Sequence, residues 1–158
     1  MPVKSFKGII TQNEVQKINL SNNDGKTGYR INKFQVFPND IDGSTSHEDL
    51  VQVWTSKLAA DNATKAADFT MGDMVAAAYY VRSSNPSAPY VATIADDQVV
   101  VDNVVFNQDI YISMKSGQTN QKINYYIELE QIKLDLVEQT VATLQSIRSS
   151  SQGTGQKA

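Results

Sequence analysis

The sequence predicts a mainly β protein: an antiparallel β-sandwich that carries an amphipathic helix at its C-terminal end. Two stretches, Asp109–Lys115 and Lys122–Leu134, alternate apolar and polar residues with the period of two that half-buried strands show. Clusters of turn-forming residues interrupt the chain at short intervals, as in sandwiches and barrels. After Asp135 the apolar residues recur every three to four positions, which indicates a helix.

The two alternating stretches lie next to each other in the chain and predict a β-hairpin. Their apolar sides are formed by one set in each stretch: Ile110, Ile112 and Met114, then Ile123, Tyr125, Ile127 and Leu129. The polar connection Ser116–Gln121 is short enough to join antiparallel neighbours. We therefore expect this hairpin at the centre of the sandwich. The apolar side of the second stretch changes near Gln131, which predicts a bulge or a new packing partner there.

The rest of the chain offers further short strands, for a total of about eight or nine. The remaining predicted strands are Val3–Ile10, Val15–Leu20, Tyr29–Phe37, Asp49–Leu58, Tyr90–Ala95 and Gln98–Phe106. In Tyr29–Phe37 the apolar face switches, so a bulge near Asn32 is expected. Ala59–Phe69 is alanine-rich and predicts a loop with a helical turn. Met71–Val81 stays open, because its alanines favour a helix and its last residues favour a strand.

The C-terminal helix is predicted over Leu136–Arg148, and residues 1–148 form one domain with it. Its apolar side consists of Leu136, Val137, Val141, Leu144 and Ile147. An isolated helix of about 13 residues is marginal in water, so this side must pack on its own sandwich or on a neighbouring subunit. Ser149–Ala158 has the composition of a flexible polar tail.

Composition excludes several classes of function. The chain has 158 residues and no cysteine, so disulfides, cysteine nucleophiles and thiolate zinc sites are ruled out. A formal charge of −3 argues against a general nucleic-acid binder. No apolar run approaches the roughly 20 residues of a membrane span. The first residues lack the apolar core of a secretory signal, so we expect a protein that is not exported by that route.

Two acidic motifs suggest chemistry only weakly. His47, the only histidine, precedes Glu48 and Asp49 and could assist acid–base catalysis, but in a polar loop an exposed histidine needs no such role. Glu128 and Glu130 lie about 7 Å apart along one strand face, a distance compatible with glycoside hydrolysis. Alternating acids on a solvated sheet face are far commoner. No catalytic residue is predicted.

Two further motifs are better explained as turns. Asp40, Asp42, Gly43 and Asp49 match part of a calcium loop, but Pro38 occupies the position of the first carboxylate. Gly25-Lys26-Thr27 matches the end of a phosphate-binding loop, yet the earlier glycine is missing and no helix follows. We therefore predict no metal site and no cofactor.

Interface residues are easier to identify than catalytic ones. Tyr125 falls on the apolar side of its strand and is expected in the core. Tyr111 and Tyr126 fall on the polar sides of their strands, where an aromatic ring suits a protein interface. Together with the apolar side of the C-terminal helix, these two tyrosines are the predicted interface residues.

Both ends of the chain carry a family resemblance. The stretches NNDGKTGYRINKFQVFP and VVFNQDIYISMKSG, with INYYIELEQIKLDLVEQTVATLQSIRSS, resemble small structural proteins of marine tailed phages and related environmental viruses. The resemblance covers roughly half of the chain and none of its middle. It implies a jelly-roll-like sandwich that assembles in or on a virion, and it implies no catalytic residue.

The expected function is therefore that of a non-enzymatic virion protein, a capsid decoration (cement) protein or a shell component. Its expected partners are further copies of itself and a major capsid or other virion protein, with no membrane and no direct nucleic-acid contact. The alternative is a carbohydrate- or receptor-binding sandwich module of a virion. A hydrolase is the third possibility, and the absence of further histidines counts against it.

Overall fold

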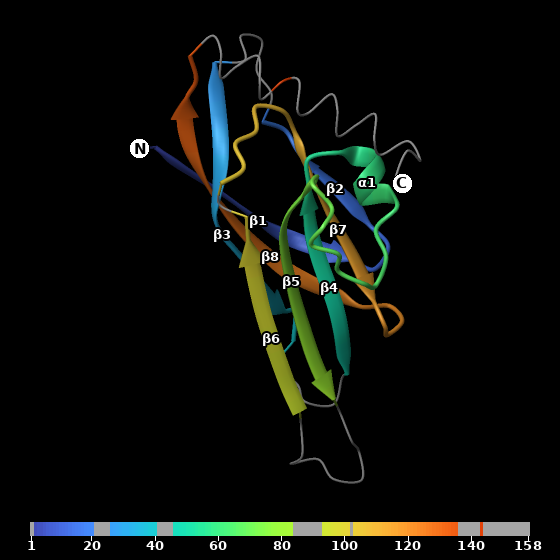
Figure 1. Cartoon of the computed structure of the whole chain (residues 1–158). Helices are drawn as coiled ribbons and strands as arrows, with labels where there is room; N and C mark the ends of the chain where they lie inside the picture. The colour runs from blue at the N-terminus through green and yellow to red at the C-terminus, as the bar shows by residue number, and fades with distance from the viewer. Residues whose placement is uncertain are drawn as a thin grey trace.

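The computed structural model describes residues 2–20, 26–40, 46–83, 93–101, 103–135 and Thr143. These residues form two antiparallel β-sheets that face each other, as the sequence predicted (Figure 1). The elements are β1 (Val3–Thr11), β2 (Val15–Ile18), β3 (Thr27–Pro38), β4 (His47–Trp54), α1 (Lys57–Asp61), β5 (Met74–Ser83), β6 (Thr93–Val100), β7 (Ile110–Ser116) and β8 (Lys122–Lys133). Sheet A has the strand order β1-β8-β3, and sheet B has the order β2-β7-β4-β5-β6.

The predicted hairpin of β7 and β8 is wrong, although both strands exist. The strands lie in different sheets and are not hydrogen-bonded neighbours. Each instead pairs with one of the first two strands of the chain: β8 pairs with β1, and β7 pairs with β2. Facing sheets are about 10 Å apart, so a short polar connection can cross between them as easily as it can close a hairpin. The alternation of apolar and polar residues therefore predicts the two strands correctly, but it does not predict which strands they pair with.

Between β1 and β2 the chain passes from sheet A to sheet B through a turn, which forms a corner of the sandwich. The carboxylate of Glu14 accepts hydrogen bonds from the backbone N–H and the hydroxyl of Thr11, at 2.9 and 3.0 Å. Asn13 has a φ of 67°, in the left-handed region that asparagine tolerates. Backbone hydrogen bonds from Gln12 to Gln121 and from Asn13 to Met114 tie this corner to the β7–β8 corner.

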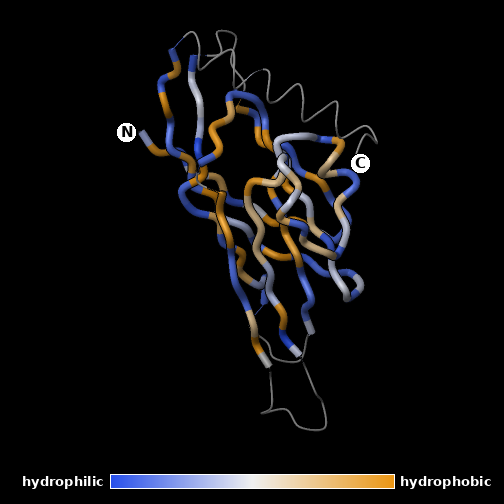
Figure 2. The backbone as a smooth tube through the Cα atoms, viewed as in Figure 1, coloured by the Kyte–Doolittle hydropathy of each residue, from blue (hydrophilic) through white to orange (hydrophobic). Residues whose placement is uncertain are grey.

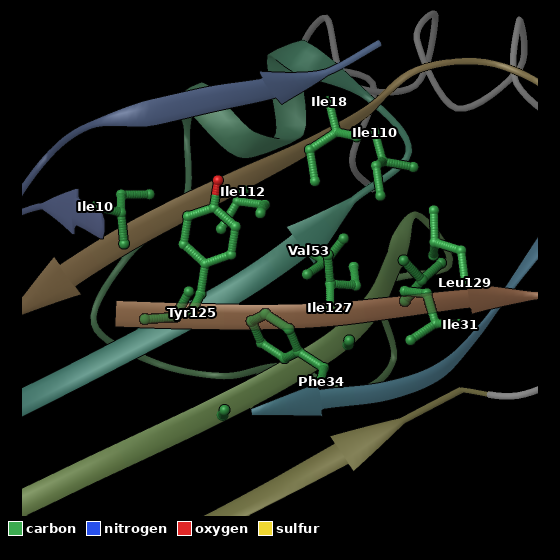
Figure 3. Packing of buried hydrophobic residues seen from close by; sticks show 14 of the residues in the cluster. Ile10, Ile18, Ile31, Phe34, Val53, Ile110, Ile112, Tyr125, Ile127 and Leu129 are labelled. Atoms are coloured by element: carbon green, nitrogen blue, oxygen red, sulfur yellow. The ribbon is translucent and has the colours of Figure 1, made fainter. Parts of the chain in front are cut away.

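The main core fills the space between the two sheets. Sheet A contributes the predicted apolar sides of β8 and β3, and sheet B contributes that of β7 (Figure 3). Ile110, Ile112, Ile127 and Leu129 are completely buried. Hydrophobic and hydrophilic residues interchange along much of the sheets, whereas residues 74–78 of β5 are all hydrophobic and buried (Figure 2). Tyr125 is also buried, which confirms the core position expected from the sequence.

The predicted bulge in β3 is confirmed. The pairing of β3 with β8 shifts register between Ile31 and Lys33, so Asn32 is the extra residue. The bulge keeps both Ile31 and Phe34 buried, although they are three positions apart. No register shift falls near Gln131 of β8, whose pairing runs on regularly to Lys133. The bulge alternative is therefore wrong; Leu134, just after the strand, is buried in the neighbourhood of Gly28 and Val105.

The outer face of sheet B is covered in part by α1 and the residues after it. The predicted strand Asp49–Leu58 is too long: β4 ends at Trp54, and Ser56 caps α1 by accepting a hydrogen bond from the N–H of Ala59. A smaller apolar cluster forms here, and its buried members are Trp54, Ala59, Ala60, Ala63, Met74 and Ala77. The ambiguous segment is the strand β5, which contributes Met74 and Ala77 to this cluster.

The region after β5 differs from its prediction. In place of two strands, Tyr90–Ala95 and Gln98–Phe106, the described part of the chain contains one, β6, at the edge of sheet B. Farther on, Phe106 forms an isolated bridge to Tyr29 of β3, with backbone hydrogen bonds of 2.8 and 3.0 Å. The chain thus pairs first with sheet B and then touches the edge of sheet A.

The predicted C-terminal helix and polar tail lie outside the described residues, with the exception of Thr143. Its hydroxyl accepts a hydrogen bond of 2.9 Å from the side-chain amide of Asn107, which is buried. This one contact connects the position to the sandwich. Among the described residues, no helix has the length and hydrophobicity needed to span a membrane.

Candidate functional site

The outer face of sheet A carries Tyr126, one of the two predicted interface residues. Because Ile123, Tyr125, Ile127 and Leu129 face the core, the residues between them point to the opposite side. Tyr126 is half-buried there, and its hydroxyl donates a hydrogen bond of 3.2 Å to the carboxylate of Glu128. The pairing registers of β1 and β3 with β8 define which residues surround it.

One half of this face carries charges of both signs. Glu130 lies opposite Arg30 of β3 and forms an ion pair with it. Glu128 lies opposite Lys33 in the next row of the same strand pair. The two glutamates are therefore on the central strand of the sheet, each beside a basic residue. Their arrangement matches a solvated sheet face better than a pair of catalytic acids.

The other half of the face carries two exposed apolar side chains among polar ones. Ile9 of β1 and Phe37 of β3 are both opposite Asn124 of β8, so the three side chains form one row across the sheet. Ile9 is 43% exposed and Phe37 is 64% exposed. Two strand spacings separate them, about 10 Å. Tyr126 is in the adjacent row, between the exposed residues Lys7 and Gln35. We call Ile9, Phe37 and Tyr126 together the sheet A patch.

Tyr111, the other predicted tyrosine, lies on the opposite side of the molecule. It belongs to the outer face of sheet B, where it is half-buried and packs against the cluster around Trp54. Tyr111 and Tyr126 therefore do not share one surface. Leu136, Val137, Val141, Leu144 and Ile147, the predicted interface residues of the helix, lie outside the described residues.

His47 is not the exposed loop residue that the sequence suggested. It begins β4, faces the core and is completely buried. Its Nδ1 is 2.8 Å from the carboxylate of Asp49, and its ring meets the ring of Tyr80 edge to face. Within the part of the chain that the structure describes, its Nε2 and the second carboxylate oxygen of Asp49 have no hydrogen-bond partner. A solute cannot reach this imidazole in the present structure, so the pair is a feature of the core.

Burial also acts on the carboxyl group of Asp49. The pKa of Asp49 is raised, chiefly because burial disfavours the charged carboxylate; the hydrogen bond from His47 acts in the opposite direction. Arg82, also buried, lies opposite His47 in the β4–β5 pairing and forms an ion pair of 2.8 Å with Asp40. Asp40 was considered as a calcium ligand; in the structure its carboxylate binds an arginine.

The described ranges contain no group of three or more histidine, aspartate or glutamate side chains placed to hold a metal ion. Asp42 and Gly43, the other members of the calcium-like motif with Asp49, do not lie in these ranges. Asp49 itself is buried against His47.

The sequence contained a signal for the sheet A patch that the prediction did not use. Ile9 is followed by Ile10, and Val36 is followed by Phe37. In a strand with one buried face, two consecutive apolar residues cannot both point into the core. Ile10 and Val36 face the core, so Ile9 and Phe37 must face outward. Such pairs mark exposed apolar positions in strands whose outer face is not covered, as in β1 and β3.

The comparisons with known proteins found no match: no family model, no curated protein and no solved structure is similar to this chain.

Proposed function

We propose that this chain is a non-enzymatic structural protein of a virion, a capsid decoration or shell component that assembles through subunit interfaces. The resemblance of its two ends to phage structural proteins supports the virion role. The sheet A patch supports assembly, because it offers a surface for a second copy of the chain. It is the observation on which this proposal depends. The two lines of support are independent, because the resemblance concerns sequence and the patch concerns exposure.

The strand order supports a jelly-roll-like sandwich. In an eight-stranded jelly roll a folded ribbon pairs the first strand with the last, the second with the seventh, the third with the sixth and the fourth with the fifth. The pairings β1–β8, β2–β7 and β4–β5 are of this kind. The pairing of the third strand with the sixth is replaced: β6 pairs with β5, and within the described ranges an isolated bridge joins Phe106 to Tyr29 of β3.

The outer face of sheet A suits a contact between identical copies. Two copies related by a two-fold axis present the same surface to each other. An exposed apolar group beside charges of both signs satisfies this condition: apolar residues can meet apolar residues, and the acidic central strand can meet the basic residues of β3. Burying a phenylalanine side chain such as Phe37 contributes about 1.5–3 kcal/mol per copy.

The first experiment measures assembly of the isolated chain. Light scattering coupled to size-exclusion chromatography should give a mass above that of the monomer, and Phe37→Asp should shift the mass toward the monomer. Phe69→Asp is the matched control, because Phe69 is equally exposed, at 62%, but belongs to the segment after α1. A monomer at all concentrations, or equal effects of both substitutions, would refute the patch as the assembly surface.

The second experiment tests the virion role directly. Purified particles of the virus that encodes this chain should contain it at a fixed ratio to the major capsid protein, measured by quantitative mass spectrometry. The ratio should survive repeated density-gradient purification. Loss of the chain during purification, or its absence from particles, would contradict the proposal.

A further inference from the structure

A cleft of about 380 Å³ opens on the outer face of sheet B, away from the sheet A patch. Its lining includes Glu48 and Leu50 of β4, Tyr79 and Val81 of β5, Lys65 from the segment after α1, and Gly117, which follows β7. Two rows of the sheet form its floor, because Leu50 is opposite Tyr79 and Glu48 is opposite Val81. A volume of this size falls in the range of small-ligand sites.

The floor of the cleft is apolar and offers an exposed aromatic ring. Tyr79 is 41% exposed, and Leu50 and Val81 beside it are half-buried. Tyrosine combines a flat apolar face with a polar hydroxyl, which suits a ligand that is apolar on one side and hydrated on the other. The β-strands hold these three side chains, so the ring is presented by a rigid part of the fold.

One residue of each charge completes the lining. Glu48 supplies a carboxylate that can accept hydrogen bonds, and Lys65 supplies an ammonium group that can donate them. Both side chains are exposed. Gly117 gives the carboxylate its space: a Cβ built on Gly117 would lie 2.1 Å from Oε2 of Glu48. Any larger residue at this position would displace the glutamate.

We propose that this cleft binds a carbohydrate. One sugar face carries C–H groups that can stack on the ring of Tyr79, and hydroxyl groups around it both donate and accept hydrogen bonds. Glu48 accepts from these hydroxyls, and Lys65 donates to them. A neutral ligand fits the cleft better than an ion, because an anion would meet the carboxylate and a cation would meet the ammonium group.

This inference does not depend on the assembly role. The cleft is on sheet B and the sheet A patch is on the opposite outer face, so each can be tested without the other. A virion protein with both would use one face to attach to the particle and leave the other free for glycans.

The test is ligand-observed NMR of the full chain with the methyl glycosides of glucose, galactose, mannose and N-acetylglucosamine. At least one should bind, with millimolar affinity and with saturation transfer strongest at its C–H face. Tyr79→Ala should abolish this binding, Tyr79→Phe should retain it, and Glu48→Gln should weaken it about tenfold through the loss of a charged acceptor.

Phe69→Ala is the matched control, since Phe69 is an exposed aromatic residue that does not line the cleft. It should leave binding unchanged. Circular dichroism should show every variant folded, as expected for exposed positions. If none of the four glycosides binds, or if Tyr79→Ala binds as well as the native chain, the proposal is wrong.

Discussion

The hydroxyl of Tyr125, on the central strand of sheet A, donates a hydrogen bond of 2.8 Å to the side-chain oxygen of Gln16, on the edge strand of sheet B. The amide nitrogen of Gln16 donates in turn to the carbonyl of Ile9 on β1, at 2.7 Å. One glutamine therefore joins the two sheets close to the corner where the chain crosses between them. Figure 3 shows the Tyr125 ring reaching across the core toward sheet B.

Removing this hydroxyl should destabilise the sandwich without changing its fold. Tyr125→Phe keeps the ring but leaves the oxygen of Gln16 without this donor, which costs about 1 kcal/mol of unfolding free energy. Urea denaturation of the two proteins measures the difference. An unchanged midpoint would mean that water replaces the hydroxyl at no cost.

Gly8→Ala should break the same contact by a different route. A Cβ at Gly8 would lie 2.8 Å from the hydroxyl oxygen of Tyr125 and 3.0 Å from its ring carbon, too close for either group to stay in place. We expect a loss of about 1–3 kcal/mol, the usual range for overpacking. In the Tyr125→Phe background the cost should fall, because the closest atom is then absent. Equal costs in both backgrounds would contradict a direct clash.

Gln52 predicts a stabilising substitution. It is buried on the outer face of sheet B, opposite Ser113 and Ala77, and its side-chain nitrogen and oxygen both lack hydrogen-bond partners among the described residues. An unsatisfied buried polar group costs about 1–3 kcal/mol. Gln52→Met preserves the length of the side chain and removes this cost, so the thermal midpoint should rise.

Ser113→Ala should lower the thermal midpoint, because it removes the hydroxyl that accepts a hydrogen bond of 2.8 Å from the indole N–H of Trp54.

Local patterns in the sequence were sufficient for the strands and the bulge at Asn32, but not for the pairing of strands. Alternation in β7 and β8 reports which side of each strand is buried, and it is the same for a hairpin and for a crossing between sheets. The partner of β8 is β1 and the partner of β7 is β2, and both partners lie roughly 90 to 130 residues earlier in the chain. No local rule contains that information.

The candidate surfaces, like the strand pairing, could be predicted from the sequence only in part. Tyr126 was identified because its strand was clear, and its neighbours Ile9 and Phe37 were missed because they belong to other strands whose register the sequence does not give. His47 was misplaced because a polar neighbourhood in sequence became a buried one in space, beside Asp49 and Tyr80. The Tyr79 cleft depends on residues from four separate segments.

The raised pKa of Asp49 predicts a pH dependence of stability. A carboxyl group with a higher pKa in the folded than in the unfolded chain stabilises the fold fully below the unfolded pKa, and this contribution is lost as the pH rises through the folded pKa. Asp49→Asn cannot ionise but can still accept from His47. The variant should therefore gain stability relative to the native chain as the pH rises from acid to neutral. Urea midpoints at matched pH values measure this difference, and a constant difference would contradict it.

Glu14 should show the opposite pH dependence. Its pKa is lowered, chiefly because the backbone N–H of Thr11 donates a hydrogen bond to the carboxylate. Its stabilising effect is therefore present above the unfolded pKa and is lost as the pH falls through the folded pKa. Glu14→Gln keeps an acceptor for Thr11 but no charge, so it should lower the urea midpoint at neutral pH and lose this effect in acid. Because Asp49→Asn changes with pH in the other direction, the two variants control for each other. A Glu14→Gln effect of equal size at both pH values would show that the carboxylate charge does not stabilise the corner between β1 and β2.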